Sequence, residues 1–260
     1  MAELLFWPAL LFYGEAAVGY LGYARRAGTA GRAAIWGVRL GWLAQTALLA
    51  VQAARENGFP WGTWAGSLNL FVWLVVTVYL GVRKPYRLVG LAVMPLAAVL
   101  LVVARAGGGT GVGARSHYSN LFLVLHVGLV LVAFAGFTLA AALSAFYLWQ
   151  ERRLKRREAT ILRRAAPSLA TLDRLASRTV LFSLPALTLG LAVGVARLLR
   201  NGERIDAVVA ATLVMWLVWA AYLVLRGARG WTGRRAAYVA LAGFALVILV
   251  RLALPAAHFA

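Results

Sequence analysis

Residues 121–149 read LFLVLHVGLVLVAFAGFTLAAALSAFYLW, a run without a single Asp, Glu, Lys or Arg. About 20 apolar residues are enough for a helix to cross the hydrocarbon core of a bilayer. Seven further apolar runs lie along the chain, at roughly residues 4–23, 33–54, 65–82, 88–104, 179–199, 207–225 and 237–254. The sequence therefore predicts an all-α polytopic membrane protein with about eight transmembrane helices, forming a single domain over residues 1–260.

The composition agrees with this fold class and narrows the possible chemistry. Hydrophobic residues make up 63% of the 260 residues and charged residues only 13%, about half the charged fraction of a typical soluble domain. There is no cysteine, which excludes disulfides, thiolate metal sites, iron–sulfur clusters and cysteine nucleophiles. The formal net charge of +19 lies mostly in the segments between the apolar runs. It therefore indicates membrane topology, and we expect no nucleic-acid partner.

The distribution of basic residues predicts how the chain is oriented in the membrane. The first, third, fifth and seventh connections hold 19 Lys and Arg residues, against 6 in the second, fourth and sixth. Basic residues accumulate on the cytoplasmic side of membrane proteins. We therefore expect a multi-pass protein of the inner (plasma) membrane, with the odd-numbered connections in the cytoplasm and both termini outside.

The basic connection at residues 150–178 is the one long cytoplasmic segment. Pro167 predicts the end of the preceding helix, and Ser168 is suited to cap a new one. In SLATLDRLASR, residues 168–178, the three leucines share one face and the charged residues lie elsewhere. This pattern predicts an interfacial helix lying on anionic lipid. A cytoplasmic or membrane protein partner that binds residues 150–178 is the alternative.

Two opposite charges lie inside the first two predicted spans. Glu15 and Arg39 are each several residues from the cytoplasmic end of their span. Because unpaired charges in a membrane are costly, we expect the two side chains to form an ion pair that joins adjacent helices. A cation or proton relay is the alternative function.

Two histidines on the predicted outer side are candidate metal ligands. His126 lies about two turns below the outer end of its span, and His258 follows Pro255 at the outer end of the last one. Two neutral imidazoles near one face of the membrane can supply both axial ligands of a haem iron. His117 is a weaker candidate because it follows a glycine-rich stretch. The alternative for His126 is a hydrogen-bonded packing residue.

Aromatic and basic residues near the same face suit a bound porphyrin. Trp61 and Trp64, both in the second connection, can stack on a macrocycle, although an interfacial aromatic belt would look the same. Three arginines near the outer ends of two spans can pair with haem propionates: Arg197, Arg200 and Arg251. The GxxxG pair of Gly190 and Gly194 predicts close helix packing.

Four stretches resemble the cytochrome c assembly (CcsA/HemX) family of eight-span membrane proteins. They are ENGFPWGTWAGSLNLFVW (56–73), LFLVLHVGLVLVAFAGFTLAAALSAFYLWQERRLKRR (121–157), PSLATLDRLASRTVLFSLPALTLGLAVG (167–194) and the terminal LALPAAHFA (252–260). In the synthetase branch of that family, the histidine of the "HV" motif and one near the C-terminus are external haem ligands. By resemblance these fall on His126 and His258.

The resemblance is nearer to the HemX branch, which is associated with haem biosynthesis and with control of glutamyl-tRNA reductase levels. The synthetases carry a tryptophan-rich WWD segment between the sixth and seventh spans, whereas this chain has ARLLRNGERIDAVVAATLVMW (196–216). A family glutamate after the "FP" motif is also replaced, by Ala65 or Gly66. The resemblance therefore implies a non-enzymatic membrane protein that binds non-covalent b-type haem. A haem-lyase-type cytochrome c synthetase subunit and a transporter of another solute are the alternatives.

Overall fold

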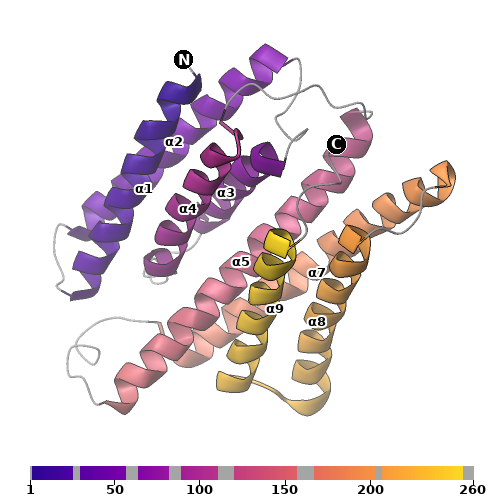
Figure 1. Ribbon diagram of the computed structural model, residues 1–260. Helices are drawn as coiled ribbons and strands as arrows, with labels where there is room; N and C mark the ends of the chain where they lie inside the picture. Colours follow the sequence, from indigo (N-terminus) through magenta and orange to yellow (C-terminus); the bar gives the residue numbers. More distant parts are fainter. Residues whose placement is uncertain are drawn as a thin grey trace. The chain divides into compact units, whose positions relative to one another are not determined.

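The chain is built from α-helices. The computed structural model describes residues 2–25, 30–56, 64–81, 89–110, 120–156, 167–202 and 207–253, and no strand occurs within these ranges. The helices of this part of the chain (Figure 1) are α1 (Ala2–Arg25), α2 (Ala30–Glu56), α3 (Trp64–Leu80), α4 (Gly90–Ala106), α5 (Asn120–Lys155), α7 (Leu169–Asn201), α8 (Ala207–Arg229) and α9 (Arg234–Ala253). The all-α prediction is confirmed.

Length and hydropathy make this a multi-pass membrane protein. Among the described residues, five helices are long and apolar enough to cross a bilayer, within α1, α2, α5, α7 and α8, and two shorter apolar helices cover Ala65–Leu80 and Gly90–Ala106. The 36 residues of α5 extend about 54 Å at about 1.5 Å per residue. This exceeds the hydrocarbon core of about 30 Å, so α5 reaches well beyond the core.

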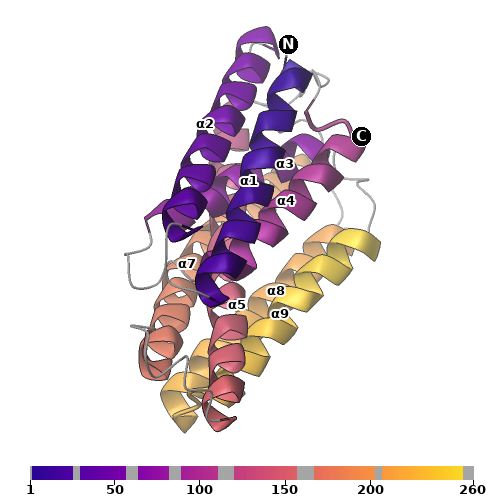
Figure 2. The same cartoon turned by 90° about the vertical axis from the view of Figure 1, so that its left-hand side faces the viewer.

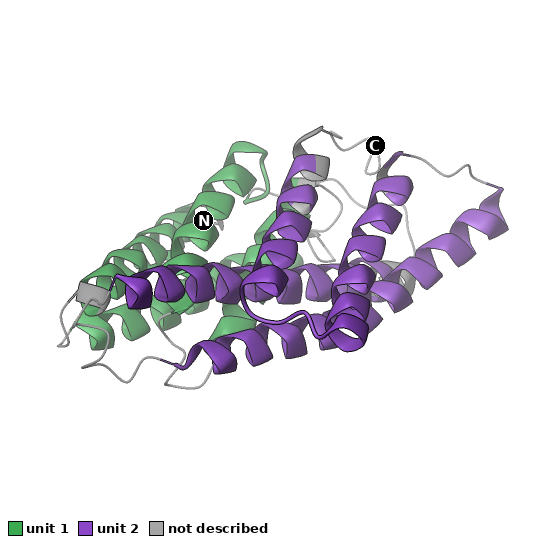
Figure 3. Cartoon of the chain, turned by 90° about the horizontal axis from the view of Figure 1, so that it is seen from below, with its two compact units in different colours: residues 1–120, 259 green, residues 121–258, 260 purple. Residues whose placement is uncertain are grey.

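The helices form two compact units, residues 1–120 and residues 121–258 (Figure 3). The single domain expected from the sequence stays a prediction. In the first unit α1 packs along α2 and against α4, while α3 packs against α4 and α2. Figure 2 shows α1 and α2 side by side. A Cβ on Gly37 would lie 3.0 Å from the Phe12 carbonyl oxygen, and one on Gly41 would lie 2.7 Å from the Tyr13 ring. Glycine is therefore needed at both positions for this close approach.

The predicted ion pair between Glu15 and Arg39 is wrong. Both residues are exposed, and the ion pairs of the described residues join other partners. The interface between α1 and α2 is filled by small residues. If a Cβ were added to Gly37, it would lie 3.3 Å from the Ala16 Cβ. This packing leaves no room for two charged side chains between the helices. The Arg39 guanidinium instead lies 5.3 Å from the centroid of the Trp36 ring.

A buried polar network joins α1, α2, α3 and the turn after α4. The Tyr13 hydroxyl donates to Gln45 Oε1 at 2.7 Å, and Gln45 Nε2 donates to Asn69 Oδ1 at 2.9 Å. Asn69 Nδ2 in turn donates to Gln52 Oε1 at 3.3 Å and to the Gly109 carbonyl at 3.2 Å. Gln45, Gln52 and Asn69 are fully buried. Since lipid offers no hydrogen bonds, these amides must satisfy one another.

The second unit has a core around two aromatic rings, to which α5, α7, α8 and α9 contribute. The ring of Phe137 stacks on that of Trp219 with centroids 4.3 Å apart and planes 6° apart. Val180 and Leu187 of α7 and Ala236 and Ala240 of α9 complete the cluster. The core thus draws on all four helices of this unit.

The structure differs from the sequence-based expectation for residues 168–178. Ser168 caps α7 as predicted, because its Oγ accepts a hydrogen bond from the Thr171 N–H. The helix then continues without interruption to Asn201, so the predicted separate interfacial helix is the beginning of a span-forming helix. No glycine or proline stands between Ser168 and residue 185 to break it. Residues 157–166 lie outside the described residues.

Candidate functional site

His126 lies on α5 against the glycine face of α7. Its Nδ1 is 2.8 Å from the Gly190 carbonyl oxygen, and a carbonyl oxygen can only accept, so Nδ1–H donates this hydrogen bond. In the neutral imidazole the lone pair then lies on Nε2. An imidazole whose Nδ1–H is held by a backbone carbonyl is oriented in the way that histidine metal ligands commonly are.

Gly194 of α7 leaves the space that this ring occupies, and Gly190 leaves space for the neighbouring Val130. A Cβ on Gly194 would lie 2.5 Å from His126 Cε1 and 2.9 Å from Nδ1, and one on Gly190 would lie 2.9 Å from Val130 Cγ2. The sequence predicts that the GxxxG pair is a packing motif. In the structure, His126 of α5 packs against Gly194 of this pair. The structure thus shows the hydrogen-bonded packing that was the alternative for His126, and the same contact orients the ring. A ligand role for His126 stays a prediction.

Arg197 shares the stripe of α7 that contacts His126. Gly190, Gly194 and Arg197 follow the i, i+4, i+7 spacing of one helix face. Arg197 is half-buried, whereas Arg200 is exposed and lies about 60° from Arg197 around the helix at about 100° per residue. The helix ends soon afterwards, where Gly202 adopts a left-handed φ of 65° and its N–H bonds to the Leu198 carbonyl. Of the two arginines, Arg197 lies on the histidine face.

Several predicted site residues lie outside what the structure describes. His258, His117 and Trp61 fall in undescribed segments. Trp64 begins α3 and Arg251 lies in α9, but the placement of these two side chains is not described. Among the described residues no group of three or more His, Asp or Glu side chains could hold a metal ion. His126, Arg197 and Arg200 are thus the predicted site residues whose side chains are described.

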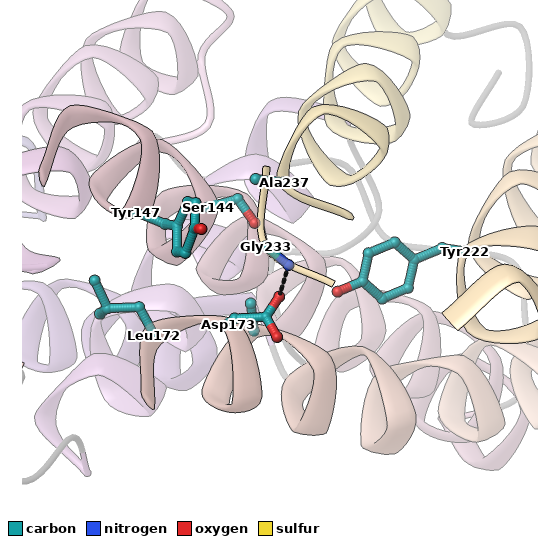
Figure 4. A pocket seen from close by; sticks show the side chains of 8 residues that line it. Ser144, Tyr147, Leu172, Asp173, Tyr222, Gly233 and Ala237 are labelled. Atoms are coloured by element: carbon teal, nitrogen blue, oxygen red, sulfur yellow. Dashed lines mark hydrogen bonds between the residues drawn. The ribbon is translucent and has the colours of Figure 1, made fainter. Parts of the chain in front are cut away.

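A pocket near the beginning of α7 has a different character (Figure 4). Asp173 lines it, and its carboxylate accepts from both Arg226 Nη1 at 2.9 Å and the Gly233 N–H at 2.9 Å, while Arg226 Nη2 reaches the second oxygen. In Figure 4 the hydroxyl of Tyr222 points toward the hydrogen bond between Asp173 and the Gly233 N–H. The Asp173 carboxylate is already hydrogen-bonded by Arg226 and Gly233. The pocket is therefore a structural junction between α7 and the α8–α9 connection. Asp173 is about 26 Å from Gly190 along the helix at about 1.5 Å per residue.

Sequence reasoning overlooked two sets of residues. The contact of Gly190 and Gly194 with His126 was not predicted, because the local sequence does not show which face of α5 packs against which face of α7. The buried amides Gln45, Gln52 and Asn69 carried a usable signal, since an amide inside an apolar run needs a partner. The spacing of seven between Gln45 and Gln52 also places both on one helix face.

The family model of "Cytochrome C assembly protein" matches residues 61–256, well over half of the chain.

This chain belongs to the cytochrome c assembly protein family.

Individual relatives in this family carry two names. Protein HemX of Brevibacillus brevis is 31% identical over 157 residues, which cover 59% of this chain and 58% of that protein. The cytochrome c biogenesis protein CcsA of Guillardia theta is 24% identical over 266 residues, covering 93% of this chain and 84% of the relative. Protein HemX of Bacillus subtilis is 23% identical over 254 residues, covering 93% and 88%. The aligned part thus spans less than two thirds of the Brevibacillus protein. No solved structure matches the chain.

Family membership supports a role in cytochrome c maturation. The matched region contains His126, the α7 glycines and both arginines described above, whereas α1 and α2 precede it. The resemblance inferred from the sequence is confirmed.

Proposed function

We propose that this protein handles haem in the membrane, binding non-covalent b-type haem for cytochrome c maturation or for the regulation of haem biosynthesis. His126 would be one axial ligand through Nε2, and His258 would be the other. The observation that carries the proposal is the hydrogen bond from His126 Nδ1–H to the Gly190 carbonyl. It favours the tautomer whose Nε2 can bind iron and keeps the ring in one orientation.

The arginines and tryptophans would complete the haem-binding residues. Arg197 follows the glycines on the histidine face of α7, where a guanidinium can pair with a propionate carboxylate. Arg200 and Arg251 would extend this basic edge, and Trp61 and Trp64 would stack on the porphyrin. Bound haem would be the cargo or the signal, and the protein residues would hold and orient it without catalysing a reaction.

The membrane setting follows from the charge distribution. We propose that the protein lies in the inner (plasma) membrane with both termini outside, because 19 of the basic residues lie in alternate connections and 6 in the others. The basic residues 150–178 would then face the cytoplasm, available to anionic lipid or to a protein partner.

Ligation of haem to an apocytochrome is less well supported than haem binding. Only residues 202–206 separate the end of α7 from the start of α8, and they contain no tryptophan. A tryptophan-rich platform at this place is what the sequence-based resemblance associates with the synthetases. We therefore propose that the chain is a haem-handling protein of the HemX type and not a synthetase subunit.

An absorption spectrum of the purified protein tests the proposal. We expect a Soret band with a low-spin, six-coordinate spectrum in the wild type, and a reduced haem-to-protein ratio in His126→Ala. His117→Ala is the matched control and should retain haem, because a glycine-rich segment precedes it. Absence of a Soret band after incubation with haemin would refute haem binding and favour transport of another solute. Equal haem retention in His126→Ala would refute haem binding at His126.

A further inference from the structure

The outward face of α1 carries a carboxylate in the middle of an apolar stripe. Leu4, Leu11 and Val18 are spaced by seven residues and are 70%, 67% and 71% exposed. Glu15 is exposed between the last two and lies inside the candidate span Leu4–Tyr23. In the described part of the chain Glu15 has no ion pair. A carboxylate facing lipid at this depth is strongly unfavourable, so a partner should cover it.

The neighbouring helix carries the opposite charge on its own outward face. Arg39 is exposed on α2, with Trp36 and Leu43 also exposed, by 58% and 54%. Its guanidinium lies against the Trp36 ring, and no carboxylate pairs with it among the described residues. A cation–π contact orients the guanidinium but does not neutralise its charge.

The two charges lie at nearly the same depth. Gly37 of α2 meets Phe12 and Ala16 of α1, and Gly41 meets Tyr13. Arg39 lies between these glycines, so it is level with Glu15 to within about one helical turn. Both side chains are exposed, and no ion pair joins them.

We propose that this outer face of α1 and α2 is a self-association surface. Two copies related by a two-fold axis along the membrane normal would pair Glu15 of each with Arg39 of the other. An isologous contact of this kind satisfies both charges of both copies at once. A partner helix that carried only one charge would leave either Glu15 or Arg39 facing lipid. The exposed Leu11, Trp36 and Leu43 would supply the apolar contact around the ion pairs.

The absence of cysteine from the 260 residues allows a direct test by disulfide crosslinking. Leu11 lies four residues before Glu15 on α1, and Leu43 lies four residues after Arg39 on α2. Because the two helices run in opposite directions, both leucines are displaced toward the same face of the membrane. Co-expression of a Leu11→Cys copy with a Leu43→Cys copy, distinguished by their tags, should give a crosslinked heterodimer after oxidation in membranes. Leu11→Cys with Val99→Cys is the matched control, since Val99 is 60% exposed on α4.

Charge variants of the crosslinking pair identify the ion pairs as the cause. Glu15→Gln should lower the heterodimer yield to that of the control pair, and Glu15→Arg combined with Arg39→Glu should restore it. Equal yields for the Leu43 and Val99 partners would overturn the proposal and indicate that another part of the same chain or a different protein covers this face. If Glu15→Gln leaves the heterodimer yield unchanged, the proposal is overturned as well. Haem absorbance should be unchanged in these variants, so this test is independent of the proposed function.

Discussion

The position of the His126 imidazole depends on Gly194, a residue without a side chain. A Cβ on Gly194 would come within 2.5 Å of its Cε1 atom, a distance at which the ring must move. Backbone glycines in membrane helices commonly permit helix–helix contact, and here the contact is with a polar ring. This makes Gly194 part of the histidine environment, although it contributes no functional group.

Gly194→Ala should therefore displace the imidazole and weaken the hydrogen bond to the Gly190 carbonyl. We expect a lower melting temperature and, if haem binds as proposed, a shifted Soret band or a lower haem content. Gly128→Ala is the matched control, because Gly128 lies on α5 two residues from His126 and a Cβ there would meet nothing within 4 Å. Equal effects of the two substitutions would show that the glycine contact does not position the ring.

At the scale of the helices, the first unit is held together by buried amides. Asn69 bridges Gln45 of α2, Gln52 of α2 and the Gly109 carbonyl after α4. Two stacked indoles, Trp42 and Trp73, lie beside it with centroids 5.9 Å apart. Removing the central amide would leave its partners unsatisfied in an apolar interior, which is costlier than the loss of one exposed hydrogen bond.

We expect Asn69→Ala to destabilise the protein by about 1–3 kcal/mol, the usual cost of leaving buried polar groups without a partner. Thermal unfolding in detergent measures this as a lower melting temperature. Val78→Ala, at a site 37% exposed on the same helix, should change it far less. A melting temperature for Asn69→Ala as high as that of Val78→Ala would mean that water or another amide replaces Asn69.

The long α7 helix is tied to the α8–α9 connection through Asp173. The Arg226 and Asp173 side chains are only 18% and 13% exposed, so this ion pair is better shielded than Lys155–Glu151, in which Lys155 is 64% exposed. Shielded, bidentate Arg–carboxylate pairs are the ones that contribute to stability, whereas exposed pairs contribute little.

Asp173→Asn should lower the melting temperature, because it leaves the Arg226 guanidinium without its counter-charge. A hydrogen bond to a charged group contributes about 1.5–3 kcal/mol. Arg174→Gln, the exposed neighbour, is the control and should have little effect. Additive losses for Asp173→Asn and Arg226→Gln in a double-mutant cycle would show that the two residues do not interact.

At the scale of the whole molecule, the prediction concerns the orientation of the chain in the membrane. Ala106 ends α4 and Thr232 lies between α8 and α9, and both are exposed. The charge distribution places these two positions on opposite sides of the membrane. In intact cells an impermeant thiol reagent should therefore label Ala106→Cys, and it should label Thr232→Cys only after permeabilisation. The reverse pattern would invert the orientation and move His126 to the cytoplasmic side.

The sequence by itself determined the helical class, the membrane setting and the family. Hydropathy is a local property that adds up along a run of residues, so the run at 121–149 predicts a span whatever its neighbours are. The family resemblance also rests on local stretches, between residues 56 and 260, and the family model matches residues 61–256. His126 was a candidate for a similar reason, since an ionisable group inside a span stands out in one dimension.

Only the tertiary structure decided which faces of the helices meet. His126 contacts Gly190, 64 residues away in the sequence, and Tyr13 contacts Gln45, 32 residues away. Glu15 and Arg39 were expected to pair because they have opposite charges at similar depth, yet the small residues between α1 and α2 turn both outward. Depth in the membrane follows from counting residues, whereas the rotation of a helix about its axis is set by non-local packing.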